Sequence, residues 1–173
     1  MLISEETNAA LNEQVGHEFA ASLQYIAIAA HFDSESLPEL AKHFYRQSDE
    51  EREHALKFVK YIIDAGGHAQ IPALEQPQAR FGSAQEAVQK ALDGEMVVTR
   101  QINSLVDLVV KEPDHITNNF LQWFVTEQLE EVSSAETLLR IVQRAGEGGL
   151  LHVEDYLARG GLQEKQKSMA PGE

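Results

Sequence analysis

Apolar residues recur along this chain at alternating steps of three and four positions, the spacing that collects side chains on one face of an α-helix. The pattern continues through four long stretches and returns in a short stretch near the end. At about 30 residues and 1.5 Å per residue, each long helix would extend roughly 40 Å. The expected helices cover residues 4–32, 37–65, 83–111, 114–145 and 150–159.

The ends of these stretches predict how the helices are joined. Ser83 with Glu86 three residues later predicts a capping box, and Asp114 predicts an N-cap. Connections of about four residues favour two antiparallel hairpins, and some seventeen residues between the second and third helices allow a crossover along the whole bundle. The sequence therefore predicts an all-α four-helix bundle of two antiparallel hairpins joined by a long crossover, plus a short fifth helix.

Polar residues interrupt the core-facing seam of every long helix near its middle. Because the three-and-four spacing never slips there, these side chains are carried inward with the apolar ones. A buried, unpaired carboxylate costs several kcal/mol, and no lysine or arginine lies on the seams to neutralise it. The inward polar residues are Glu18, Glu51, His54, Glu95, Gln128 and Glu131.

Metal ions would supply the missing positive charge. Four carboxylates are balanced by two divalent cations, and oxygen ligands with one imidazole suit iron, manganese or zinc. A repeat supports this interpretation, because Glu18, Glu51 and His54 each have a polar counterpart 77 positions later. Each hairpin thus supplies one glutamate and one i, i+3 pair, whose side chains share a helix face. The pattern predicts a di-metal site related by a pseudo-two-fold axis.

Two alternatives without a metal site remain open from the sequence alone. A lone Glu-x-x-His on a helix is usually a solvated pair, and an isolated seam glutamate can be protonated or lie at a wet end of the bundle. A purely structural bundle would require all of the seam acids to bind nothing. The coincidence of six polar positions on four helices favours the metal site.

Composition narrows the classes of function. With 14 basic and 28 acidic side chains, the net charge is −14, so phosphates would be repelled and nucleic acid is not an expected partner. The absence of cysteine excludes disulfides, thiolate metal sites and cysteine nucleophiles. No secretory signal and no apolar run of about 18 residues is found, so we expect a cytoplasmic protein without a membrane partner.

Four segments resemble non-haem bacterial ferritins, and the resemblance extends over about residues 5–160. The segments are HEFAASLQY, SDEEREHA, the surroundings of Glu95, and FLQWFVTEQLEE. The resemblance implies a ferroxidase and iron-storage subunit that oxidises Fe(II) with O2 or H2O2. The product would be deposited as a ferric mineral inside a hollow homo-oligomeric shell, which in this family has 24 subunits.

The resemblance also implies a role for each matching residue. Glu18, Glu51 and His54 match the ligands of a first iron. The second iron would share Glu51 as a bridge and add Glu95 and Glu131, with Gln128 nearby. The acids that match a third iron site are Glu50, Glu127, Glu130 and Glu131. The aromatic residues that match a tyrosine and a tryptophan beside the irons are Tyr25 and Trp123.

The chain departs from related patterns at several positions. Bacterioferritins repeat Glu-x-x-His in the fourth helix, but Ser134 stands here instead of the second histidine. Their haem-binding methionine lies between the glutamate and histidine of the second helix, where this chain has Arg52 and Glu53, so we expect no haem. Glu53 is instead a candidate acid facing the mineral.

The route by which iron enters is not indicated. Animal ferritins line their three-fold pores with acids, whereas the nearest positions here are Asn118 and Leu121. Asp114 and His115 are weak substitutes and are better explained as capping residues. We expect residues 1–160 to form the di-iron domain and residues 161–173 a flexible tail.

Other classes built on the same bundle are disfavoured for specific reasons. Di-iron or di-manganese enzymes such as catalases and oxygenases usually keep two histidines, and rubrerythrins need cysteines for electron transfer. DNA-protecting mini-ferritins normally build their metal site between subunits. Iron loading would separate storage from an enzyme that holds two metal ions per chain.

Overall fold

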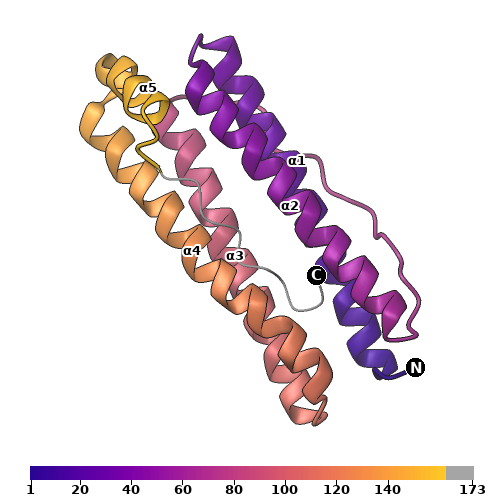
Figure 1. Cartoon of the computed structure of the whole chain (residues 1–173). Coiled ribbons are helices and arrows are strands. Elements are labelled where there is room, and N and C mark those ends of the chain that lie inside the picture. The colour runs from indigo at the N-terminus through magenta and orange to yellow at the C-terminus, as the bar shows by residue number, and fades with distance from the viewer. Residues whose placement is uncertain (163–173) are drawn as a thin grey trace.

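The computed structural model describes residues 1–162 and contains four long helices arranged as two hairpins (Figure 1). The tail predicted for residues 161–173 falls almost entirely outside this range. The elements are α1 (Glu5–Ser34), α2 (Pro38–Asp64), α3 (Ala84–Lys111), α4 (His115–Ala145), the 3-10 turn η1 (Glu147–Gly149) and α5 (Leu150–Ala158). The predicted all-α bundle with a short fifth helix is confirmed, and no helix end differs from the prediction by more than two residues.

The helix starts follow from local hydrogen bonds. Ser4 and Asp114 act as N-caps, accepting the backbone N–H of Thr7 at 2.9 Å and of Thr117 at 3.0 Å. Ser83 caps α3 by accepting the Glu86 N–H at 3.1 Å. The reciprocal half of the predicted capping box differs, because the Glu86 carboxylate accepts the N–H of Gly82 rather than that of Ser83. The carboxylate thus satisfies a donor one residue earlier.

The crossover between α2 and α3 runs back along the α1–α2 hairpin (Figure 1). Polar side chains of α1 fix it in place: Asn12 donates to the His68 carbonyl at 2.9 Å and accepts from the Gln70 N–H at 2.6 Å. Gln24 bonds the backbone of Gln78 in the same two-sided way, at 2.8 and 3.0 Å. The long connection is therefore held by side chains of α1 along its length.

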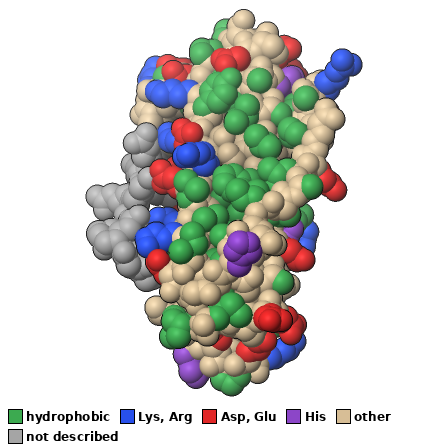
Figure 2. Space-filling view, turned by 90° about the vertical axis from the view of Figure 1, so that its right-hand side faces the viewer, with side chains coloured by type: hydrophobic (Ala, Val, Ile, Leu, Met, Phe, Trp, Pro, Cys, Tyr) green, Lys and Arg blue, Asp and Glu red, His purple; other side chains and the backbone are tan. Residues whose placement is uncertain are grey.

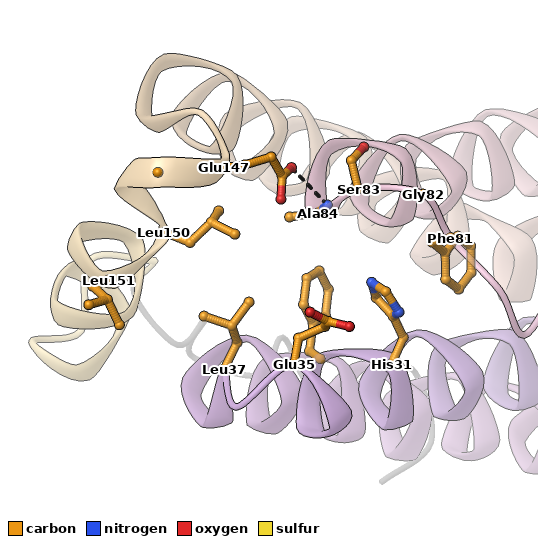
Figure 3. A pocket seen from close by; sticks show the side chains of 12 residues that line it. His31, Glu35, Leu37, Phe81, Gly82, Ser83, Ala84, Glu147, Leu150 and Leu151 are labelled. Atoms are coloured by element: carbon orange, nitrogen blue, oxygen red, sulfur yellow. Dashed lines mark hydrogen bonds between the residues drawn. The ribbon is translucent and has the colours of Figure 1, made fainter.

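The C-terminal elements close one end of the bundle. Glu147 of η1 accepts the backbone N–H of Ala84 at 3.0 Å, beside a pocket of about 430 Å³ between the ends of α1, α3 and α5 (Figure 3). Glu154 of α5 accepts two backbone N–H groups at the start of α2. Both carboxylates satisfy donors at helix N-termini, where negative charge is favoured.

The apolar core is divided into two clusters by a polar layer. One cluster includes Ile28, Phe32 and Phe44 toward the α5 end, and the other includes Leu11 and Phe58 toward the opposite end. Nearly all seam positions predicted from the spacing are buried. The polar seam residues fall between the clusters on all four long helices, as the sequence predicts. None of the described helices is long and apolar enough to cross a membrane.

Candidate metal centre

The polar layer brings together the six inward residues predicted from the sequence. None of the six side chains is more than 5% exposed, so all six are almost completely buried. They come from four helices: Glu18 from α1, Glu51 and His54 from α2, Glu95 from α3, and Gln128 and Glu131 from α4. The alternative that Glu51 and His54 form a solvated Glu-x-x-His pair is therefore excluded.

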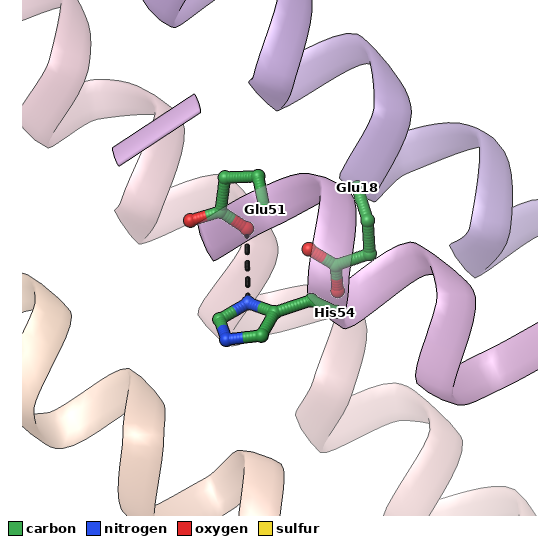
Figure 4. Close-up of side chains that lie close together, drawn as sticks. All are labelled: Glu18, Glu51 and His54. Carbon is green, nitrogen blue, oxygen red and sulfur yellow. Dashed lines mark hydrogen bonds and ion pairs between the residues drawn. The ribbon is translucent and has the colours of Figure 1, made fainter. Parts of the chain in front are cut away.

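Glu18, Glu51 and His54 form the tightest group (Figure 4). Each offers one ligand atom, and these atoms all lie within 4.8 Å of one another. His54 Nδ1 lies 3.1 Å from Glu51 Oε2, one helical turn along α2. Two carboxylates and one imidazole at this spacing are a donor set suited to a first-row transition metal.

Two oxygens of this group have no hydrogen-bond partner among the described residues. They are Glu18 Oε2 and Glu51 Oε1, and both are buried. Buried polar atoms in proteins are almost always hydrogen-bonded, and an orphaned carboxylate oxygen is costly. The donor set therefore fits a bound cation, which would satisfy both oxygens.

The second half of the centre is more fully hydrogen-bonded. Tyr25 donates its hydroxyl to Glu95 Oε1, and Gln128 donates to Glu95 Oε2 at 3.1 Å. Gln47 donates to Glu131 Oε2 at 2.9 Å. These donors are uncharged, so they hold the carboxylates in position without neutralising the negative charge that would attract a cation.

Burial and mutual repulsion raise the pKa values of these acids. Burial, reinforced by the charge of Glu51, raises the pKa of Glu18 to about 8, and burial with repulsion from Glu131 raises the pKa of Glu95 to about 7. The pKa of Glu51 is also raised well above its ordinary value by burial and by Glu95. No lysine or arginine of the described chain pairs with Glu18, Glu51 or Glu95. Without metal, the centre therefore retains protons near neutral pH.

The acids assigned by resemblance to a third iron site lie at the margin of this layer. Glu50, Glu127 and Glu130 are half-buried, and Glu53 is exposed. The charge of Glu50 contributes to the raised pKa of Glu51, which places it within electrostatic reach of the centre. Each of these acids makes a further interaction in the fold.

Trp123 lies beside the first group, as the family comparison of the sequence suggests. Its ring meets the His54 imidazole edge to face, with centroids 5.4 Å apart, and Lys57 Nζ lies 5.2 Å from the ring centroid. At the positions nearest to the pore acids of animal ferritins, Leu121 is fully buried and Asn118 is half-buried. Leu121 therefore cannot line an opening in this subunit.

Two glutamines extend the site beyond the predicted set. Gln14 donates to Glu18 Oε1 at 2.8 Å and is 2% exposed, and Gln47 holds Glu131 as described. Gln47 occupies a seam position, but the seam spacing alone assigns no role to its amide. Gln14 lies one turn before Glu18, off the seam, and a search for polar residues four positions from each seam acid would have found both.

The fold and the centre together define a four-helix bundle with a buried layer of carboxylates that could hold metal ions. A family model described as a ferritin-like domain matches residues 8–145, most of the chain. The chain therefore belongs to the ferritin family, and the resemblance to non-haem bacterial ferritins is confirmed.

Individual relatives agree with this assignment. The chain is 45% identical to "Ferritin BfrB" of Mycolicibacterium smegmatis over 152 residues, covering 88% of this chain and 83% of that protein. It is 38% identical to "Bacterial non-heme ferritin" of Staphylococcus aureus, covering 84% and 88%. Among solved structures it is similar to an open-pore ferritin of Archaeoglobus fulgidus, with a TM-score of 0.87 and 34% identity over 90% of this chain and 98% of that one.

Proposed function

We propose that this chain is a ferroxidase and iron-storage subunit, which oxidises Fe(II) at the buried carboxylate centre. The observation that carries the proposal is the pair of orphaned oxygens, Glu18 Oε2 and Glu51 Oε1, in a layer of four buried glutamates. Such a layer is stable only when protons or cations balance its charge. Iron storage is in keeping with the family and with the names of its relatives.

Each residue has a defined part in this proposal. Glu18, Glu51 and His54 would bind the first Fe(II). Glu51 would also bridge to the second, which Glu95 and Glu131 complete. Two Fe²⁺ then reduce one O2 with two protons, giving two Fe³⁺ and one H2O2. Carboxylates suit this step because they are hard oxygen donors and stabilise the higher charge of Fe³⁺.

The two halves of the centre are unequal, which favours transfer over permanent binding. Gln128 is neutral where Glu51 is charged, and Glu131 stands 77 positions after His54, so the second half has no histidine. The weaker half would release oxidised iron, and the half-buried acids Glu50, Glu127 and Glu130 would pass it onward. Tyr25 and Trp123 are candidate electron donors, and Tyr25 stays protonated because burial raises its pKa well above the ordinary value.

Assembly into a closed homo-oligomer is part of the same proposal. Apolar side chains gather on the face that carries α1 and the crossover (Figure 2). Leu23, Ile26, Ile71 and Leu74 of these segments are 37–62% exposed. An apolar area of this kind is typical of an interface. Size-exclusion chromatography of the native protein tests for a 24-subunit shell, and a monomer would contradict it.

Stopped-flow oxidation tests the centre itself. With two Fe(II) per subunit, Glu51→Ala should abolish the fast phase, because both irons lose a ligand. Glu13→Ala, which removes an exposed acid of α1, is the matched control and should oxidise iron normally. An unchanged rate in Glu51→Ala would remove the proposed site. Loading of hundreds of irons per shell would support storage, while saturation at two per chain would indicate an enzyme.

The absence of haem and a cytoplasmic location remain predictions. Arg52 and Glu53 stand between Glu51 and His54, and both are exposed. Neither side chain has the thioether that a haem iron would take as a ligand there. The absorption spectrum of the protein purified after growth with excess haem checks this. A haem Soret band in stoichiometric amount would contradict the prediction.

A further inference from the structure

Gln14 of α1 is a buried side chain that holds one oxygen of Glu18. It lies one helical turn before Glu18, on the same face of the helix, and is 2% exposed. Its Nε2 donates to Glu18 Oε1 at 2.8 Å. The amide therefore satisfies one of the two oxygens of a carboxylate that belongs to the proposed first metal site.

The other oxygen of Glu18 is left without a partner. Glu18 Oε2 is buried and makes no hydrogen bond to any residue within 1–162. The side chain extends from α1 toward Glu51 and His54 of α2 (Figure 4). Glu51 Oε1 lacks a partner in the same way. The two oxygens of Glu18 thus differ, because the protein satisfies Oε1 and leaves Oε2 available to a cation.

The orientation of the Gln14 amide agrees with both of its neighbours. A carboxylate that binds a metal ion is ionised and only accepts hydrogen bonds, so the amide nitrogen must face Glu18. The amide oxygen then lies 3.4 Å from His17 Nδ1, a long hydrogen bond in which the ring donates. An amide turned the other way would place its oxygen against the carboxylate and its nitrogen against the ring donor.

We propose that Gln14 is a positioning residue for the first metal site, and that it makes Glu18 bind the metal through Oε2 alone. The proposal rests on the proposed ferroxidase function. The hydrogen bond to Oε1 opposes rotation of the carboxylate and weakens that oxygen as a metal ligand. Groups that orient a metal ligand by hydrogen bonding typically lower metal affinity by roughly 10–100-fold when they are removed.

Binding through one oxygen of Glu18 keeps the first metal ion accessible. Glu18, Glu51 and His54 each offer one ligand atom to a shared position, so the protein supplies three. A first-row divalent ion takes about four to six ligands, so at least one position stays open to a small molecule from solvent. A second oxygen from Glu18 would occupy such a position. Gln14 therefore limits how many ligands the protein itself provides.

Anaerobic metal binding tests the proposal apart from the oxidation step. Gln14→Met keeps the length of the side chain but has no N–H donor. Competition with a chelator should show that Zn(II) binds the first site about tenfold more weakly than in the wild type. Co(II) at the same site should have a different d–d absorption spectrum, because the oxygens around the ion have moved. Equal affinity and an identical spectrum in Gln14→Met would overturn the proposal.

Val15→Ala separates positioning from packing. Val15 is the next residue of α1, is fully buried in the same apolar cluster as Leu11, and has no polar group in its side chain. The variant should melt at a lower temperature than the wild type but keep the wild-type Zn(II) affinity and Co(II) spectrum. If it changed the spectrum as Gln14→Met does, the effect of Gln14 would be one of packing and the proposal would be wrong.

A second variant keeps the test valid if methionine disturbs folding. Gln14→Ala removes the donor without adding an apolar group of similar length, and it should weaken the first site in the same direction. A first-site affinity equal to that of the wild type in Gln14→Ala would also overturn the proposal.

A crystal structure of the Zn(II)-loaded wild type tests the geometry directly. Glu18 Oε2 should lie about 2.0–2.2 Å from the ion, while Oε1 keeps its hydrogen bond to Gln14. Two bonded oxygens from Glu18, or Oε1 in place of Oε2, would overturn the proposal. If no metal binds at Glu18, the positioning role and the ferroxidase proposal both fail. If Zn(II) binds as described but the wild type does not oxidise Fe(II), only the ferroxidase proposal is wrong.

Discussion

Glu154 accepts the backbone N–H of Leu40 at 2.9 Å, across 114 positions of sequence. Its other oxygen accepts the N–H of Glu39 at 2.8 Å. Leu37, the N-cap residue of α2, makes no side-chain capping bond of its own. The short fifth helix thus supplies the N-terminal cap that α2 lacks, and the same contact fixes α5 on the bundle.

Glu154→Gln should therefore loosen α5 and the start of α2 together. One carboxylate oxygen is replaced by an amide donor that faces a backbone N–H, so we expect a loss of about 1–3 kcal/mol. Hydrogen exchange should be faster in both segments. Asp155→Asn, at a neighbouring exposed side chain, is the control. Unchanged exchange in α5 would show that other contacts hold it.

The metal-free protein should lose stability as pH rises from 6.5 to 8. Glu18 has a folded pKa of about 8, above its unfolded value near 4.5, so the folded state holds a proton that the unfolded state has released. Glu95, with a pKa of about 7, acts in the same direction. The free energy of unfolding should fall by on the order of 1–2 kcal/mol across this window.

The window is chosen to isolate the acids. The lowered pKa values of His43 and His17 make stability rise with pH, in the opposite direction, but mainly below about 6.5. Thermal unfolding in buffer with a chelator measures the effect, and Glu18→Gln should flatten it. A stability that rises between pH 6.5 and 8 in the wild type would contradict the assignment.

Gln128→Glu should make the fold more dependent on metal. The amide donates to Glu95 Oε2 at 3.1 Å and to Thr99 Oγ1 at 3.2 Å, and a glutamate would lose both bonds and add repulsion. We expect the metal-free protein to lose roughly 1–3 kcal/mol. Zn(II) should then raise the melting temperature more in the variant than in the wild type. Gln122→Glu, exposed on the same helix, should show no such difference.

The sequence predicted the layer of acids because helical spacing is a local property. Glu18 and Glu95 could be placed inward from the apolar residues three and four positions away, and burial of both is confirmed. The hydrogen bonds that complete the layer were not predicted. Tyr25 meets Glu95 only because α1 packs on α3, and no spacing within either helix encodes that approach.

The same limit applies to the ends of the helices. Ser4 and Asp114 cap helices from adjacent positions and were predictable. Glu147 and Glu154 cap helices 63 and more positions away, after the chain has folded back on itself. From the sequence alone these two acids are indistinguishable from ordinary surface residues. Only the tertiary structure brings a helix N-terminus next to each of them.

Gly16 of α1 tests how tightly the crossover is held. A Cβ at this position would lie 2.3 Å from Pro72 Cγ of the crossover, and the segment is fixed nearby by Asn12. Alanine favours a helix over glycine by about 1 kcal/mol, but here the methyl group must displace the crossover. We expect Gly16→Ala to lower the free energy of unfolding by about 1–3 kcal/mol. Gly94→Ala on α3, where a Cβ meets nothing within 4 Å, should raise it by about 0.5–1 kcal/mol. Chemical denaturation of both variants measures these changes. If Gly16→Ala also gained stability, the crossover would not be in tight contact with α1 at this position.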